Sequence, residues 1–356
     1  MSVDLHHHGD RDVAAGLVDL AVNVRLPAPP PWLADVVARS LADLGRYPDA
    51  TAATEAVAAR HGVPVEAVLP TAGGAEAFTL VARALDVRRP SVVHPQFTEP
   101  EAALRAAGHD VHRHVLDAAD GFRLDPAAYR AGGRSRTGAG AADLVVVGNP
   151  TNPTGVLHPR ADVLALRAPG RTLVVDEAFM DAVPGEAESV LGHGEDLDGV
   201  LVLRSLTKTW GLAGLRTGYV VGDPALVARL RAVQPPWSVS TPALAATVAC
   251  TSDRASAEAE AAALAFRRDR AVLVAELDAA GFAVAGTPAT PFVLVDTSPL
   301  GPASVREDLA ARGFAVRRGE TFPGLGPTWI RVAVRDVATS RAFVSALSEL
   351  RSRRVA

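Results

Sequence analysis

Short, uninterrupted apolar runs alternate with segments of helical spacing between residues 91 and 222. Runs such as Leu144-Val-Val-Val147 lack the polar alternation of a half-exposed strand, so we expect both faces of these strands to be covered. Strands are predicted near residue 69 and at residues 91–94, 111–115, 144–148, 172–176, 200–204 and 218–222, with helices between them at residues 99–107, 160–167 and 224–232. This order predicts an α/β fold with an open, mostly parallel sheet wrapped by helices.

The pattern changes after residue 240 to long alanine-rich helical segments and shorter strands. Helices are predicted at residues 242–251, 255–280, 304–312 and 337–351, and strands at residues 292–296, 315–317 and 329–334. We therefore predict a large domain at residues 46–240 and a smaller α+β domain formed by residues 1–45 and 241–356. Residues 130–142, rich in Gly, Ser and Ala, are predicted to form a loop between two strands of the large domain.

Composition and charge exclude several classes of protein. The net charge of -4 argues against a nucleic-acid or anionic-membrane partner, and no apolar run reaches the roughly 18 residues of a membrane span. The N-terminal residues lack the basic and apolar regions of a secretory signal, and the single Cys250 excludes an internal disulfide, so we expect a cytoplasmic protein. Three adjacent histidines, His6-His-His8, cannot all face one ion, and we expect no metal site.

Lys208 is the only lysine among the 36 lysine and arginine residues. Arginine can replace lysine in a solvated ion pair, but only the lysine amine can lose its proton and attack a carbonyl carbon. Apolar residues 200–203 precede Lys208, and a glycine-rich turn that ends at Arg216 follows it. These neighbours are not typical of a surface lysine, so we predict a reactive amine.

Polar residues gather where predicted strands end. The segments are Asn149-Pro-Thr-Asn-Pro-Thr-Gly155, Asp176-Glu-Ala-Phe179, Ser205-Leu-Thr-Lys208 and the turn at Gly73-Gly74. Ligands of open α/β sheets bind beyond the carboxyl ends of the strands, and small residues that open a helix leave backbone N–H groups free for an anion. An aldehyde that forms an imine and carries a phosphate would use every one of these groups.

These segments, together with Gly214-Leu-Arg216, resemble the class I and II aminotransferase family of pyridoxal phosphate (PLP) enzymes, in the same order and over nearly the whole chain. The resemblance implies the type I PLP-dependent transferase fold. It implies that Lys208 binds PLP as an imine, that Asp176 pairs with the ring nitrogen, and that Asn152 bonds the ring hydroxyl. Many relatives have tyrosine where this chain has Phe179, so the pKa of the imine is expected to be higher here.

The resemblance implies further contacts with the cofactor. Phe97 is expected to stack on the ring, and Tyr47 to reach the cofactor phosphate of a neighbouring subunit, which implies a homodimer with shared active sites. The remaining phosphate contacts are expected from Gly74, Ala75, Ser205, Thr207 and Arg216.

Substrate contacts are expected from the second half of the chain and from the arm. The resemblance implies that Arg331 binds the substrate carboxylate with a bidentate guanidinium. Arg317, Arg335 and His8 are candidates for binding a second anion, and Asn23 lies in a segment that is near the active site in the resembled fold. The alternative is that one or two of these arginines are solvated charges at strand edges.

Two branches of the family fit the sequence. We favour the threonine-phosphate decarboxylases of cobalamin biosynthesis, because Arg46-Tyr-Pro-Asp-Ala50, Pro236-Trp-Ser-Val239 and His8-Gly9 resemble them. The alternative is a histidinol-phosphate-type or other aminotransferase, suggested by Arg46-Tyr-Pro-Asp49 and Gly211-Leu-Ala-Gly-Leu-Arg216. Asn23-Val-Arg-Leu26 departs from the pattern of the decarboxylases. Both branches imply a small, phosphorylated amino compound as the substrate.

Overall fold

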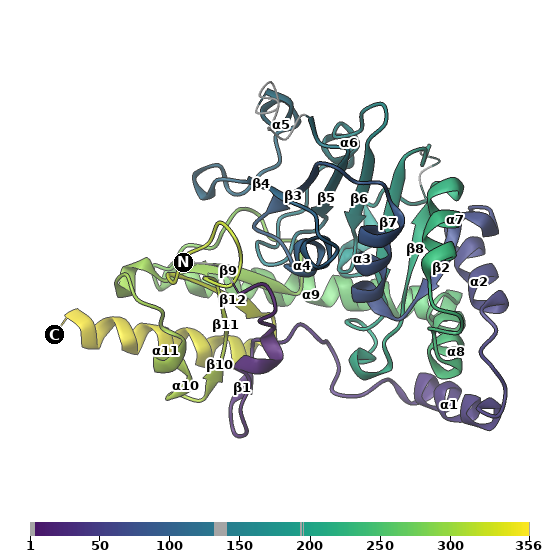
Figure 1. Cartoon of the computed structure of the whole chain (residues 1–356). Helices are drawn as coiled ribbons and strands as arrows, with labels where there is room; N and C mark the ends of the chain where they lie inside the picture. Colours follow the sequence, from purple (N-terminus) through teal and green to yellow (C-terminus); the bar gives the residue numbers. More distant parts are fainter. Residues whose placement is uncertain (1–3, 132–140, 193, 195, 356) are drawn as a thin grey trace.

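The computed structural model describes residues 4–131, 141–192, 194 and 196–355, and it is built around one large sheet (Figure 1). In this part of the chain the sheet has seven strands in the order β2-β8-β7-β6-β5-β3-β4. The strands are β2 (Val68–Thr71), β3 (Pro90–His94), β4 (His112–Val115), β5 (Leu144–Gly148), β6 (Thr172–Asp176), β7 (Val200–Ser205) and β8 (Gly218–Gly222). Neighbours from β4 to β7 run parallel, whereas β8 is antiparallel to β7 and β2, so the predicted mostly parallel sheet is confirmed.

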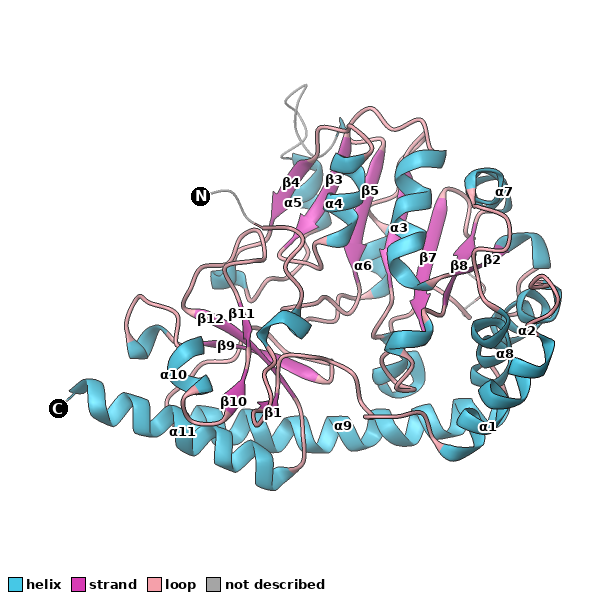
Figure 2. Ribbon diagram, turned by 60° about the horizontal axis from the view of Figure 1, so that its bottom comes forward, coloured by secondary structure: helices cyan, strands magenta, loops and turns pink. Residues whose placement is uncertain are grey.

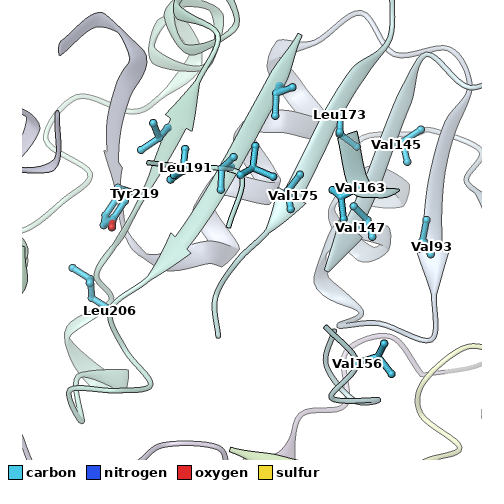
Figure 3. Close-up of a cluster of buried hydrophobic side chains, with 14 of the residues drawn as sticks. Val93, Val145, Val147, Val156, Val163, Leu173, Val175, Leu191, Leu206 and Tyr219 are labelled. Atoms are coloured by element: carbon cyan, nitrogen blue, oxygen red, sulfur yellow. The ribbon is translucent and has the colours of Figure 1, made fainter. Parts of the chain in front are cut away.

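Both faces of this sheet are buried, as the apolar runs predicted. Val145, Val147 and Val175 point to one face, where Figure 3 shows them side by side. The alternate residues Val146 and Val174 belong to the hydrophobic cluster on the opposite face. Polar side chains are disfavoured in the middle of a strand that is covered on both faces. They are therefore expected mainly at the ends of these strands.

Helices cover both faces of the large sheet. Helices α3 (Gly73–Ala84), α4 (Glu99–Ala106) and α7 (Pro224–Val233) contribute to the cluster on one face. The opposite face is covered by α2 (Thr51–His61), α5 (Pro126–Ala131), α6 (Arg160–Leu164), α8 (Thr241–Cys250) and the start of α9 (Asp253–Ala279). Most of the loop predicted at residues 130–142 lies outside the described residues.

Helix α9 connects the two cores. Its Ala255 and Ala259 pack with the large sheet, and its Leu273 and Leu277 pack with the small domain. A helix of 27 residues is roughly 40 Å long, which is enough to reach both. Figure 2 shows α9 lying alongside α11 (Val337–Val355) below the small sheet.

The small domain combines the C-terminal part of the chain with the N-terminal arm. In the described residues its sheet has three antiparallel strands, β11 (Arg317–Arg318), β12 (Trp329–Ala333) and β9 (Phe292–Asp296). Beside it, β1 of the arm (Val18–Asp19) pairs in parallel with β10 (Phe314–Ala315), and the short helix α10 (Arg306–Ala310) precedes β10. The predicted strand at residues 315–317 is thus two strands, because β10 pairs with the arm and β11 with β12.

Helices α1 (Pro31–Ser40) and α8, which are about 200 residues apart in the sequence, pack together on the large sheet. Helix α1 contributes Leu33 and α8 contributes Ala246 to the core of that sheet. The boundaries predicted from the sequence assign both helices to the smaller domain, and those boundaries remain a prediction. No helix among the described residues is both long and apolar enough to cross a membrane.

Candidate active site

A cleft of about 500 Å³ lies between the carboxyl edge of the large sheet and the small domain. Most of the predicted site residues line it: Lys208, Asp176, Gly74, Ala75, Phe97, Asn152, Ser205, Thr207, Arg216, Arg331, Arg317, His8 and Asn23. The structure therefore brings together residues from the arm, the large sheet and the small sheet. Tyr47 and Arg335 lie outside this cleft.

The parallel strands explain how three of these groups meet. Gly148, Asp176 and Ser205 are the last residues of β5, β6 and β7, and β5 pairs Gly148 with Asp176. Because the carboxyl ends of parallel neighbours lie at one edge of the sheet, the segments that follow these strands enter the same space. Asn152 and Lys208 lie in two of these segments and reach the cleft from them.

Asp176 lies on the cleft wall and has little support from hydrogen bonds. Its Oδ1 accepts from the backbone amide of Ala178 at 3.1 Å. Burial raises the pKa of the carboxyl to about 6, the amide bond and the Lys208 ammonium oppose the rise, and the Glu177 carboxylate adds to it. A protonated ring nitrogen in the cleft would supply the missing donor, so this carboxylate fits the role of ring partner.

Lys208 has an unusually acidic ammonium group. Burial lowers its pKa to about 8, and the nearby guanidinium groups of Arg331 and Arg216 lower it further, whereas Asp176 and Asp10 oppose them. At this pKa an appreciable fraction of the amine is neutral near pH 8, which imine formation requires. A buried lysine with a lowered pKa is consistent with the reactive amine expected from the sequence, and that role stays a prediction.

The start of α3 and two other segments line one part of the cleft with groups that suit an anion. Gly73 has a positive φ of 78°, and a Cβ there would lie 2.8 Å from Nη2 of Arg216. Arg216 itself is left-handed, with φ at 58°. The hydroxyls of Ser205 and Thr207, which line the same cleft as Arg216, lie 2.8 Å apart. Free amides at a helix start, two hydroxyls and a guanidinium fit a phosphate group.

Arg331 crosses the cleft from β12. Its Nη1 donates to Oδ1 of Asn152 at 2.6 Å, and its Nη2 donates to the backbone oxygen of Ala21 in the arm. With the amide oxygen of Asn23 turned toward it, the guanidinium also donates to that oxygen from Nη1 and Nε, at 3.0 and 3.2 Å. Burial lowers the pKa of Arg331 to about 9, so an anion in the cleft would find a poorly solvated cation.

Arg317 is buried, so it is not one of the solvated strand-edge charges that the sequence left as an alternative. Its Nη2 donates to the backbone oxygen of His7 at 2.6 Å, and its Nη1 lies 3.4 Å from Oδ2 of Asp12. The same carboxylate pairs with Arg318 at 3.0 Å. The arm thus holds the Arg317 guanidinium on the cleft wall through Asp12, a residue that sequence reasoning missed.

His8 lines the cleft, and its side chain is 37% exposed. Its Nε2 is 2.8 Å from Oε1 of Glu99 at the start of α4, and its ring packs at 5.8 Å from the ring of Phe97. Thr98 donates to the backbone oxygen of Leu5 at 2.7 Å. The arm is therefore attached to the large domain by the residues that follow Phe97. Sequence reasoning missed Glu99, which lines the same cleft.

The two predicted residues outside the cleft have other contacts. The Arg335 guanidinium donates to the backbone oxygens of Asp19 and Val22, at 3.2 and 2.9 Å, and so holds the arm in place. Tyr47 is 75% exposed and stacks on Trp237 with ring centroids 4.2 Å apart. Within this chain neither side chain reaches the space between Lys208 and Arg331.

Phe179 and Gln96 also line the cleft. Phe179 is buried and packs edge-on against Phe292 with ring centroids 5.0 Å apart. Gln96 is also buried, and its Nε2 lies 3.5 Å from the backbone oxygen of Val146. Gln96 was not predicted, because a lone glutamine in a strand-to-helix turn is also common in structural roles.

Comparisons with known proteins agree with this geometry. The sequence model of the family "Aminotransferase class I and II" matches residues 16–347. A histidinol-phosphate aminotransferase of Mycobacterium tuberculosis is 48% identical over 332 residues, which cover 92% of this chain and 86% of the relative. A threonine-phosphate decarboxylase of Salmonella typhimurium is 30% identical over 344 residues, which cover 93% of this chain and 90% of the relative. The crystal structure of a histidinol-phosphate aminotransferase from Clostridium acetobutylicum has the same fold, with a TM-score of 0.83 at 23% identity, over 95% of this chain and all of that one.

Proposed function

Because the chain belongs to the class I and II aminotransferase family, whose members depend on PLP, we propose that it transfers the amino group of a histidinol-phosphate-type substrate to an oxo acid. The relative at 48% identity carries the histidinol-phosphate name, and the relative with the decarboxylase name is 30% identical. The comparisons thus support the aminotransferase alternative better than the decarboxylase that the sequence motifs favoured.

In this proposal different cleft residues contact different parts of the cofactor. Lys208 would hold the aldehyde carbon of PLP, Asp176 the proton on its ring nitrogen, and Asn152 its ring hydroxyl, while Phe97 covers one ring face. The remaining residues would hold the phosphate: Gly74, Ala75, Ser205, Thr207 and Arg216. Bound PLP supplies an electron sink that weakens the bonds of the substrate carbon bearing the amino group.

The amine of Lys208 then serves as the acid and base. With a pKa lowered to about 8, its Nζ can accept the proton from the substrate carbon and return it elsewhere. The guanidinium of Arg331 keeps that pKa low from the other side of the cleft. Closure of the arm over the cleft, through His8 and Glu99, would limit the access of water during this proton movement.

One observation supports a phosphorylated substrate most directly. Two buried guanidinium groups, those of Arg317 and Arg331, line the same cleft as Lys208. Histidinol phosphate carries a phosphate and no carboxylate, so both arginines could bind one dianion. The carboxylates of an oxo-acid acceptor could occupy the same position in the second half of the reaction.

The test is a pair of assays on the purified protein. It is incubated with histidinol phosphate and 2-oxoglutarate, and separately with threonine phosphate, and glutamate and CO₂ are measured in each. We expect glutamate from the first mixture and no CO₂ from the second. Release of CO₂ from threonine phosphate, without glutamate from histidinol phosphate, would identify the decarboxylase instead.

We further propose a homodimer in which Tyr47 of each subunit serves the cleft of the other. Tyr47 is largely exposed and lies outside its own cleft. Leu41 and Leu44, 53% and 58% exposed, precede it in the chain, and Trp237, 59% exposed, stacks on it. A second copy would cover this apolar surface, which supports the assignment.

A further inference from the structure

Consecutive residues at the end of β6 line different cavities. Asp176 lines the cleft, whereas Glu177 lines a small separate cavity and its side chain is fully buried. At the end of β7, Ser205 lines both the cleft and the small cavity, whereas the preceding Arg204, with a side chain 5% exposed, lines the small cavity and not the cleft. Because successive side chains of a strand point to opposite sides, the two charged residues meet behind the cleft wall.

Glu177 and Arg204 form a closely bonded ion pair. Oε2 of Glu177 lies 2.9 Å from Nη2 of Arg204 and accepts from the Ser189 hydroxyl at 2.8 Å, while Oε1 accepts from the Val190 amide at 2.7 Å. Nη2 of Arg204 also donates to Oε2 of Glu186 at 2.6 Å. Two charges this deeply buried carry a large desolvation cost, and these bonds offset it. The pair joins the ends of β6 and β7 to the loop that follows β6.

The orientation of Asp176 depends on the same stretch of backbone. Its carboxylate accepts from the amide of Ala178, so its direction follows the backbone from residue 176 to residue 178. That backbone is fixed at its centre, because the Glu177 amide donates to the Leu203 oxygen at 2.9 Å and the Glu177 side chain is bonded to Arg204.

From this geometry we infer that the buried Glu177–Arg204 ion pair is a positioning device, which aims the Asp176 carboxylate at the ring nitrogen of the cofactor. The inference rests on the proposed role of Asp176, because the pair acts through that carboxylate and does not touch the cleft. Loss of the pair should therefore weaken one contact with PLP, that of the ring nitrogen, and leave the phosphate contacts intact.

The test compares two cofactors on the full chain freed of PLP. One is PLP, and the other is its analogue with carbon in place of the ring nitrogen; the dissociation constant of each is measured by absorbance or fluorescence titration. The parent should bind PLP more tightly, and Asp176→Asn should remove this preference. A parent without any preference would disprove the role of Asp176 itself, independently of the ion pair.

The main variant is Glu177→Leu combined with Arg204→Met, since apolar residues of similar volume often preserve stability at a buried ion pair. We expect the dissociation constant for PLP to rise about tenfold, equivalent to about 1.4 kcal/mol. The constant for the analogue should stay within about twofold, below the roughly threefold loss that one weak hydrogen bond produces. The single variant Arg204→Lys, with Glu177 intact, should keep much of the preference for PLP. A single nitrogen of Arg204, Nη2, contacts Glu177, Glu186 and Ser189, and the lysine ammonium can take its place.

Two single variants make the test independent of how well the double variant folds. Ser189→Ala removes one bond to each member of the pair and should lower the PLP preference a few fold. Arg60→Gln is the matched control, since Arg60 binds Glu186 at 2.9 Å at the far end of the network and should leave the preference unchanged. The inference is overturned if the preference equals that of the parent in every folded variant, or if the affinities for both cofactors fall together.

Discussion

Arg331 donates a hydrogen bond of 2.6 Å to Asn152, although the two residues are 179 positions apart in the chain. The bond joins β12 of the small domain to the segment after β5 of the large sheet. In the proposed function Asn152 binds the cofactor and Arg331 binds the substrate. Substrate binding should therefore compete with this bond, and the two domains should respond to ligands together.

The first prediction separates the arginines that looked alike in the sequence. Arg317→Ala should lower kcat/KM for phosphorylated substrates, by a factor equivalent to about 1.5–3 kcal/mol of transition-state stabilisation, the usual contribution of a charge-assisted hydrogen bond. Unphosphorylated amino acids with a single carboxylate should be nearly unaffected. Arg335→Ala should affect both classes alike, because Arg335 holds the arm rather than the cleft wall. Steady-state kinetics with matched substrates decides this, and an equal loss for both classes in Arg317→Ala would rule out the anion site.

A second prediction concerns Asp176. Asp176→Asn should lower kcat by about 100-fold to 1000-fold, as loss of a group that stabilises charge in the transition state does. PLP should still bind, since the phosphate contacts are separate from Asp176. Absorbance titration measures the binding and stopped-flow kinetics the turnover. Turnover within a few fold of the parent would show that Asp176 is not the ring partner.

A third prediction follows from the pKa of Lys208. Only the neutral amine can attack the aldehyde, so the rate of PLP capture by the apoprotein should rise with pH and level off above about pH 8. The Arg331 guanidinium disfavours the ammonium form, so Arg331→Ala should raise the pKa and move the midpoint to higher pH. Rapid-mixing absorbance at a series of pH values gives both curves. A midpoint that moves to lower pH would contradict the electrostatic account.

The fourth prediction tests the shared active sites. Lys208→Ala and Tyr47→Phe subunits, each impaired alone, should regain activity when mixed, because a heterodimer contains one cleft in which both groups are intact. Native mass spectrometry confirms that subunits have exchanged. If heterodimers form and activity stays at the level of the separate variants, Tyr47 serves no neighbouring cleft.

The positions of Asp176, Ser205 and Lys208 could be predicted from the sequence because local patterns determine them. Each follows an uninterrupted apolar run, and a parallel sheet brings the ends of such runs to one edge. Arg317 and Arg331 also face the same way for a regular reason, since β11 and β12 pair them directly across the ladder. Arg335 lies beyond the end of β12 at Ala333, where that register no longer applies.

Other parts of the site could not be predicted because they depend on long-range packing. Asp12 reaches Arg317 across 305 positions, which requires β1 of the arm to pair with β10. The contact of His8 with Glu99 and the bond from Arg331 to Ala21 depend on the same placement of the arm. No local pattern in an arm with several prolines specifies where it crosses the molecule.

The most direct measurement of the central claim is chemical. Lys208 is the only lysine, so reduction of the holoenzyme with borohydride should place the whole cofactor adduct on one peptide. Digestion and mass spectrometry should find the reduced PLP adduct on Lys208, and Lys208→Arg should lack both the adduct and the activity. Protein that binds PLP and turns over substrate, yet carries an unmodified Lys208 after reduction, would contradict the account.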